Sequence, residues 1–321
     1  RMLYVPGNHD SMVWHALEYE TRVVRPISLG EPPGLFRSVQ PAVIRLGSTG
    51  VEVSLPGLSN PPGDVFLKSL MGEGVVVAYP NAYLVTPGQT VLLTHGQYFE
   101  GFWAVAGELV HEAARPELPA PSDMTMRRIV EFNHPLSQLS CTGIGQAGEL
   151  TDIARWFQQD VKEHRVGPGT RVHRYLSRAA AFIRRFPDYS GVLGGVEEVA
   201  FGITTQLGMT LLERSLAKAE PARDNEEWLE DRRVARRLEA FLRACALEVA
   251  ALDAAQPTLA PVGIPTHLVF GHTHEPIPWA RQQLVEPRRA IGVCNTGGWL
   301  DWTKAQILLH DDAGFHSHAV H

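Results

Sequence analysis

The strongest constraint on the fold is a local pattern that occurs three times, in which a short apolar run ends in a polar loop. The loops carry Gly7-Asn8-His9-Asp10, Thr94-His95-Gly96 and Gly271-His272-Thr273-His274. Short apolar runs bounded by glycine and proline are typical of strands buried in a sheet. Because ligands bind α/β sheets at the ends of the strands, the three loops together predict one shared site.

The residue types in these loops indicate metal chemistry. Imidazole, amide and carboxylate groups suit divalent ions such as Zn, Mn, Fe, Co or Ni. Two histidines separated by one residue, as in His272-Thr273-His274, can point at two neighbouring ions. Two ions about 3.5–4 Å apart clamp the oxygens of a phosphoryl group during in-line attack. The glycines allow the backbone to turn sharply beside such ions.

In this order and context, the three motifs resemble those of the calcineurin-like metallophosphoesterase superfamily. The run Asn295-Thr296-Gly297-Gly298-Trp299 is also similar to the segment that follows the Gly-His-x-His motif in that family. The resemblance covers residues 1–100 and 262–321. It implies an α/β fold, the four-layer αββα sandwich, in which two packed sheets are flanked by helices. It also implies hydrolysis of a phosphate ester or pyrophosphate bond in a small phosphorylated substrate.

The resemblance implies a role for each motif residue. Asn8, His95 and His272 would bind one divalent ion, and His274 would bind the second. His9 would be catalytic, stabilising the transition state or protonating the leaving oxygen, and Asp10 would orient its imidazole. A hydroxide that bridges the two ions would be the nucleophile.

The chain departs from the family pattern in one respect. The family carries Asp-x-His and Gly-Asp-x-x-Asp motifs that supply most ligands of one ion and the bridging carboxylate. No Asp-x-His occurs in this sequence, and Gly63-Asp64, the only Gly-Asp, has Leu67 in place of the second acid. We therefore expect a core that is incomplete at the N-terminus of a longer protein, and little or no activity from this chain.

Two other functions remain open from the sequence. One is a non-catalytic scaffold that keeps the fold, and the other is a mononuclear metal-binding protein that uses only the visible ligands. Each motif taken alone also has a plain structural interpretation. His95 could be a satisfied histidine at a strand end, and the glycine-containing motifs could be surface turns. Three C-terminal histidines are interpreted as a solvated tail: His316, His318 and His321.

The central part of the chain predicts helices, whereas both ends predict strands. Helical patterns cover 11–19, 123–132, 150–165, 171–186 and 225–254. Strands are expected at 1–5, 39–46, 51–55, 75–79, 91–94, 267–270, 290–294 and 305–309. This order predicts a core of residues 1–100 and 262–321 interrupted by an inserted helical cap, 101–261.

Basic residues recur along one predicted helix of the cap. Arg171, Arg174 and Arg178 lie three and four residues apart, which places them on one helical face. They are candidates for binding the phosphate of a substrate. The alternative is a solvated basic face with no ligand.

Composition limits the classes of function. Hydrophobic residues make up 44% and charged residues 20%, which is typical of a globular protein with a core. A formal charge of −6 gives no general attraction to nucleic acid, and no apolar run reaches the roughly 18 residues of a membrane span. The widely spaced Cys141, Cys245 and Cys294 favour a reducing compartment, so we expect a cytoplasmic protein. The sequence does not indicate the oligomeric state.

Overall fold

The computed structural model describes most of the chain in two compact units. The described residues are 2–8, 10–36, 38–47, 50–54, 75–100, 104, 124–134, 151–163, 165–183, 229–273, 275–286, 289–297, 305–311 and 313–319. Unit 1 comprises Arg1–Phe99, Pro119–His134 and Arg223–His321. Unit 2 comprises Glu100–Leu118 and Pro135–Ala222.

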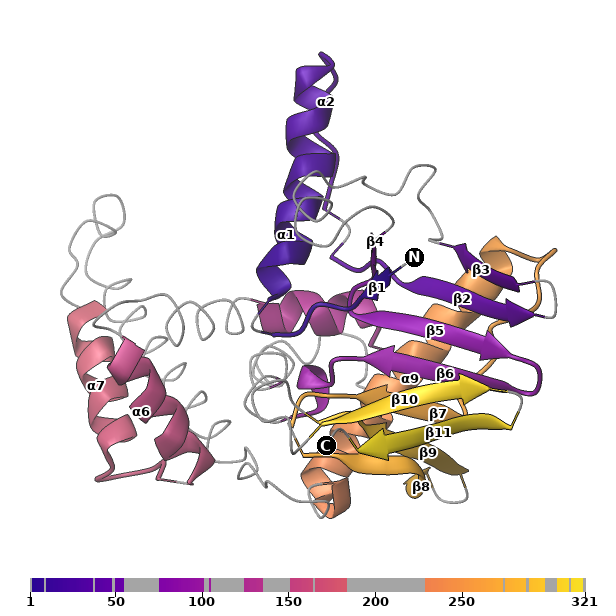
Figure 1. Cartoon of the computed structure of the whole chain (residues 1–321). Coiled ribbons are helices and arrows are strands. Elements are labelled where there is room, and N and C mark those ends of the chain that lie inside the picture. Colours follow the sequence, from indigo (N-terminus) through magenta and orange to yellow (C-terminus); the bar gives the residue numbers. More distant parts are fainter. Residues whose placement is uncertain are drawn as a thin grey trace. The chain divides into compact units, whose positions relative to one another are not determined.

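Within its described residues, unit 1 is built on a seven-stranded mixed sheet (Figure 1). In sheet order the strands are β3 (Gly50–Ser54), β2 (Ala42–Gly47), β5 (Asn81–Thr86), β6 (Gln89–Thr94), β7 (His267–Phe270), β9 (Arg289–Asn295) and β8 (Ile277–Glu286). β6, β7 and β9 are parallel neighbours, and β2 is parallel to β5. The remaining pairs are antiparallel. The chain is therefore a mixed α/β protein, as the sequence predicts.

One face of the sheet packs against the long helix α9 (Arg232–Ala255). Leu92 and Leu268 of the sheet share a core cluster with Leu238 and Phe241 of α9. All four side chains are almost completely buried. Because successive side chains of a strand point to opposite faces, the neighbours of Leu92 in β6 face the other way.

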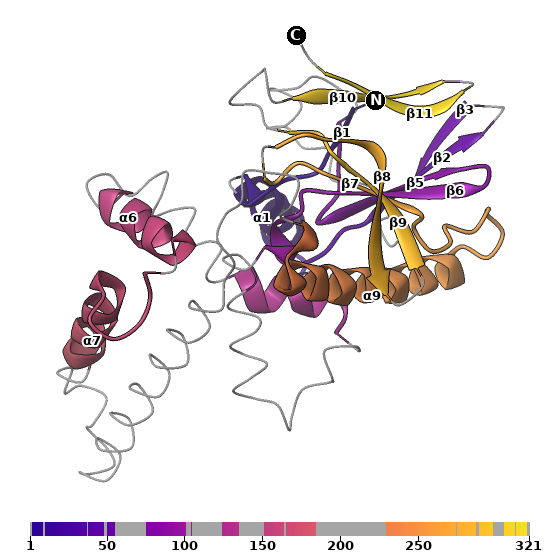
Figure 2. The ribbon, with the colours of Figure 1, turned by 90° about the horizontal axis from the view of Figure 1, so that it is seen from below.

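The opposite face is covered by two small two-stranded sheets. The antiparallel pair β10 (Gln306–Asp311) and β11 (Gly314–Ala319) packs Leu308 and Phe315 against the sheet. The parallel pair β1 (Met2–Tyr4) and β4 (Val75–Val77) packs Leu3 against Ala42 and Ala82. Leu93 of β6 contacts both clusters. Figure 2 shows α9 on one side of the large sheet and β10–β11 on the other.

A continuous helix follows the first polar loop (Figure 1). It consists of α1 (Ser11–Tyr19), a π-helical segment, Glu20–Val24, and α2 (Arg25–Ser28). Trp14 and Leu17 of α1 are buried, and the ring of Trp14 stacks on Tyr79 at 5.8 Å. This packing holds α1 against the rest of unit 1.

Two helices that fall within the predicted cap, the helix over 126–134 and α9, lie in unit 1. Met126 and Val130, from a helix over 126–134, join the same core cluster as Leu238 and Phe241 of α9. Their apolar faces pack into the core of the seven-stranded sheet, so both helices are part of unit 1. This differs from the expected boundaries, which assigned all of 101–261 to the insertion.

The described part of unit 2 is a pair of helices, α6 (Thr151–Lys162) and α7 (Arg171–Ile183). Thr170 caps α7, because its hydroxyl accepts a hydrogen bond from the backbone N–H of His173 at 3.2 Å. Val161 and Val172 are completely buried in this unit. None of the described helices of either unit combines the length and the apolar character that crossing a membrane requires.

Candidate metal centre

The three polar loops meet at one end of the large sheet. β6 and β7 are parallel, with Leu93 opposite Val269, so both strands end at the same edge. The backbone N–H of Gly271 donates to the carbonyl of His95 at 3.2 Å, which joins the two loops directly. The loop after β1 brings Asn8 to the same place, where its amide oxygen lies beside the ring of His95.

Two of the predicted ligands, Asn8 and His272, contact the third, His95. Nε2 of His95 lies 2.8 Å from Oδ1 of Asn8 and 3.1 Å from Nδ1 of His272. The two imidazole rings meet edge to face, with centroids 5.0 Å apart. Asn8 and His272 are both buried. Ligand-type atoms of Asn8 and His272 therefore both approach Nε2 of His95.

The spacing of these donors fits a divalent transition ion. At a metal–ligand distance of about 2.1 Å, neighbouring donors are roughly 3.0 Å apart in octahedral geometry and 3.4 Å in tetrahedral geometry. The two observed separations, 2.8 and 3.1 Å, are close to the octahedral value. Imidazole nitrogens with an amide oxygen also form a donor set that such ions accept. The two separations and the residue types are thus compatible with one ion beside Asn8, His95 and His272.

Two glycines allow the loops to approach this closely. A Cβ atom on Gly7 would lie 2.6 Å from Cε1 of His95, so the imidazole ring rests directly against the backbone of Gly7. Gly96 has φ of 105°, and a Cβ there would lie 3.0 Å from the rings of Phe99 and Phe270. A side chain at either position would displace the loop or the ring next to it.

Asp10 anchors the first loop. Its carboxylate accepts hydrogen bonds from the backbone N–H of Gly7 and from the hydroxyl of Tyr4. Burial, together with the neighbouring Asp10 carboxylate, raises the pKa of Tyr4, so the hydroxyl stays protonated and remains a donor. The predicted partner of Asp10, His9, lies outside the described residues. The sequence did not indicate Tyr4, because a tyrosine in a short apolar strand looks like a core residue.

The segment after β9 supports the third loop. The side-chain amide of Asn295 donates to the hydroxyl of Thr273 at 2.5 Å and accepts from the backbone N–H of Gly297 at 3.0 Å. The backbone N–H of Thr296 donates to the carbonyl of Phe270 at 2.8 Å. Asn295 and Thr296 thereby fix the loop that carries His272.

The fourth predicted ligand, His274, lies outside the described residues. Among the residues that are described, no three His, Cys, Asp or Glu side chains are grouped so as to hold a metal ion. The cluster of Asn8, His95 and His272 is not such a group, because Asn8 is an asparagine.

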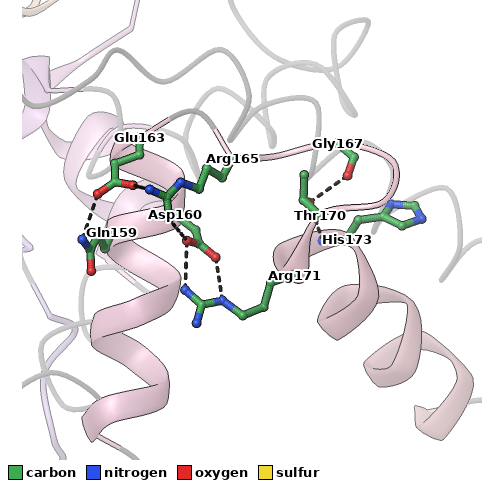
Figure 3. Close-up of polar contacts among 8 residues, drawn as sticks. All are labelled: Gln159, Asp160, Glu163, Arg165, Gly167, Thr170, Arg171 and His173. Carbon is green, nitrogen blue, oxygen red and sulfur yellow. Dashed lines mark hydrogen bonds and ion pairs between the residues drawn. The ribbon is translucent and has the colours of Figure 1, made fainter.

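The basic face of α7 is only partly available to a ligand (Figure 3). Nε and an NH₂ group of Arg171 donate to the two carboxylate oxygens of Asp160 at 2.8 and 2.9 Å. The same guanidinium lies 4.3 Å from the centre of the Trp156 ring. Arg171 thus joins α7 to α6, whereas Arg174 and Arg178 are exposed. Of the three predicted phosphate-binding residues, Arg171 has a structural contact.

Comparisons with family models, with curated proteins and with solved structures found no match to this chain.

Proposed function

We propose that this chain is a divalent metal-dependent phosphoesterase and that unit 1 contributes its four-layer core. The observation that supports the proposal is the meeting of Asn8, His95 and His272 at one sheet edge, with donor separations of 2.8 and 3.1 Å. The layer of β1, β4, β10 and β11 on the face opposite α9 supports the fold assignment.

In this proposal Asn8, His95 and His272 hold one ion and His274 contributes to a second. Ions held there supply Lewis-acid polarisation of a phosphoryl oxygen. Asp10 and Tyr4 hold the first loop, so that Asn8 keeps its position beside His95. His9, which lies between Asn8 and Asp10 in the sequence, would donate a proton to the leaving oxygen. The substrate is a phosphate ester or a pyrophosphate.

The test measures hydrolysis of p-nitrophenyl phosphate, bis(p-nitrophenyl) phosphate and a nucleoside diphosphate in Mn²⁺ and in EDTA. We expect a slow Mn²⁺-dependent rate, because no bridging carboxylate of the family pattern is present in the sequence. His95→Gln should abolish this rate, whereas Gly47→Ala should leave it unchanged, because a Cβ on Gly47 would have no atom within 4 Å. A rate that survives in EDTA or in the His95 variant would refute the proposal.

A mononuclear metal-binding protein is the second candidate. It is favoured by one observation, that the described residues gather donors for one ion. Metal analysis of the purified chain separates the candidates. Two ions per chain at this edge support the esterase, and one ion without hydrolysis supports the mononuclear protein. No bound metal at all would support a scaffold.

A further inference from the structure

The hairpin of β10 and β11 carries a second pair of histidines on its outer face. His316 and His318 are two residues apart in β11, so their side chains leave the same face of the strand. His316 is paired with Leu309 and His318 with Ile307, two exposed residues of β10. The inner residues Leu308 and Phe315 face the large sheet instead. His316 and His318 lie in a strand and not in a tail, although His318 is exposed to solvent as expected. His321 lies outside the described residues.

The two rings have the separation that chelation of one ion requires. With a metal–nitrogen distance of about 2.05 Å, two imidazoles on one ion have ring centroids about 4.5 Å apart at 90° and about 5.2 Å at the tetrahedral angle. The centroids of His316 and His318 are 5.1 Å apart, with the rings perpendicular. The pair in the proposed metal centre, His95 and His272, measures 5.0 Å.

The centroid separation excludes chelation by another close histidine pair, His15 of α1 and His134 of the helix over 126–134. His15 and His134 have ring centroids 4.0 Å apart, which is shorter than either chelating geometry permits. Their contact is a packed one, and burial lowers the pKa of both rings, that of His15 to about 4. The spacing of His316 and His318 therefore differs from that of this packed histidine pair.

A carboxylate lies beside one of the two rings. Oδ2 of Asp311 is 3.6 Å from Nε2 of His316, on the outer face of the hairpin. Histidine ligands commonly direct their second ring nitrogen to a carboxylate, which fixes the tautomer and makes the ligating nitrogen more basic. Because Asp311 lies beside Nε2 of His316, Nδ1 is the ring nitrogen that remains to bind a metal ion.

We propose that His316 and His318 form a separate binding site for a divalent transition ion of the Zn²⁺, Ni²⁺ or Cu²⁺ class, with Asp311 as the carboxylate behind His316. Water completes the coordination, because the outer face of the hairpin is open to solvent. Imidazole suits these ions, and hard ions such as Mg²⁺ and Ca²⁺ bind oxygen instead. The site is independent of the proposed phosphoesterase centre, since it uses none of the same residues.

The test is a Zn²⁺ titration of the chain in competition with a chromophoric chelator at pH 7.5. It is made in a His95→Gln/His272→Gln background, so that only the hairpin site is counted. We expect one Zn²⁺ per chain, and no Zn²⁺ after His316→Gln/His318→Gln is added. Asp311→Asn should weaken Zn²⁺ binding about 10-fold, the usual cost of losing such a carboxylate.

Ile307→Ala is the matched control, because Ile307 is exposed on the same face opposite His318 and carries no ligand atom. It should leave Zn²⁺ affinity unchanged. Zn²⁺ affinity that stays within twofold of the parent in the His316→Gln/His318→Gln variant, with thermal unfolding unchanged, would overturn the proposal. Absence of Zn²⁺ binding in the background variant would overturn it as well.

Discussion

Replacing Gly7 by alanine tests the geometry of the metal centre at its tightest contact. The new Cβ would lie 2.6 Å from Cε1 of His95 and 2.7 Å from both ring nitrogens. Ordinary contact with a Cβ begins at 3.4 Å. The ring of His95 must therefore move by about 0.8 Å, since each atom pair has a steep repulsive wall below its contact distance.

A movement of this size removes one donor from the site. Metal–ligand distances in working sites vary by about 0.2 Å, so a ring displaced by about 0.8 Å no longer binds in place. We expect Gly7→Ala to weaken Mn²⁺ binding about 10- to 100-fold, which is the loss seen when a metal site loses a supporting group. Overpacking of this kind costs about 1–3 kcal/mol of folding stability, so the chain should still fold.

The assay is isothermal titration with Mn²⁺, accompanied by thermal unfolding of each variant. Gly47→Ala is the control, because a Cβ on Gly47 at the end of β2 would have no atom within 4 Å. The control should bind Mn²⁺ as the parent does. If folded Gly7→Ala binds Mn²⁺ with the affinity of the parent, His95 does not ligate the ion from the observed position, and the reasoning is refuted.

Three further predictions concern stability and reactivity. Burial raises the pKa of Glu248 above its ordinary 4.5, so the folded state keeps a proton that the unfolded state releases. The free energy of unfolding therefore falls as pH rises above about 4.5. Glu248→Gln should raise the melting temperature more at pH 8 than at pH 5 in calorimetry, and an equal shift at both pH values would contradict this. Arg171→Ala breaks the pair with Asp160 and should lower the melting temperature of the helical unit by circular dichroism, whereas the exposed Arg174→Ala should not. Burial raises the pKa of the Cys294 thiol to about 12. A thiol reagent at pH 8 should therefore modify Cys294 only as the protein unfolds. Fast modification of the native chain would contradict this prediction.

Local sequence patterns predicted the elements that carry the site. β7 at His267–Phe270 and α1 at Ser11–Tyr19 begin and end where the sequence placed them. Both have strong local signals, a bounded apolar run for β7 and a helical period for α1. In contrast, β8 was not predicted, because Ile277–Glu286 is rich in polar residues and its pairing with β9 depends on residues distant in sequence.

The site could be predicted only in part. The motifs identified Asn8, His95 and His272, and the parallel register of β6 and β7 explains why two of them meet. Tyr4 and the close approach of Gly7 could not be predicted, because both depend on the side-by-side placement of loops that are remote in sequence. The metal-binding and catalytic roles of these residues stay predictions.

The compact units do not follow the expected boundaries of the insertion, for a related reason. The sequence of α9 shows an amphipathic helix but does not show which surface its apolar face covers. Leu238 and Phe241 pack against the seven-stranded sheet, so this helix is part of the core of unit 1. The helical pattern therefore predicted α9 as a helix, but it did not show that α9 packs in unit 1.

Anomalous diffraction from crystals of this chain grown with Mn²⁺ tests the central claim most directly. The account predicts a peak about 2.0–2.2 Å from Oδ1 of Asn8 and from one ring nitrogen each of His95 and His272. An ordered sheet edge with no anomalous peak between these three side chains would contradict it.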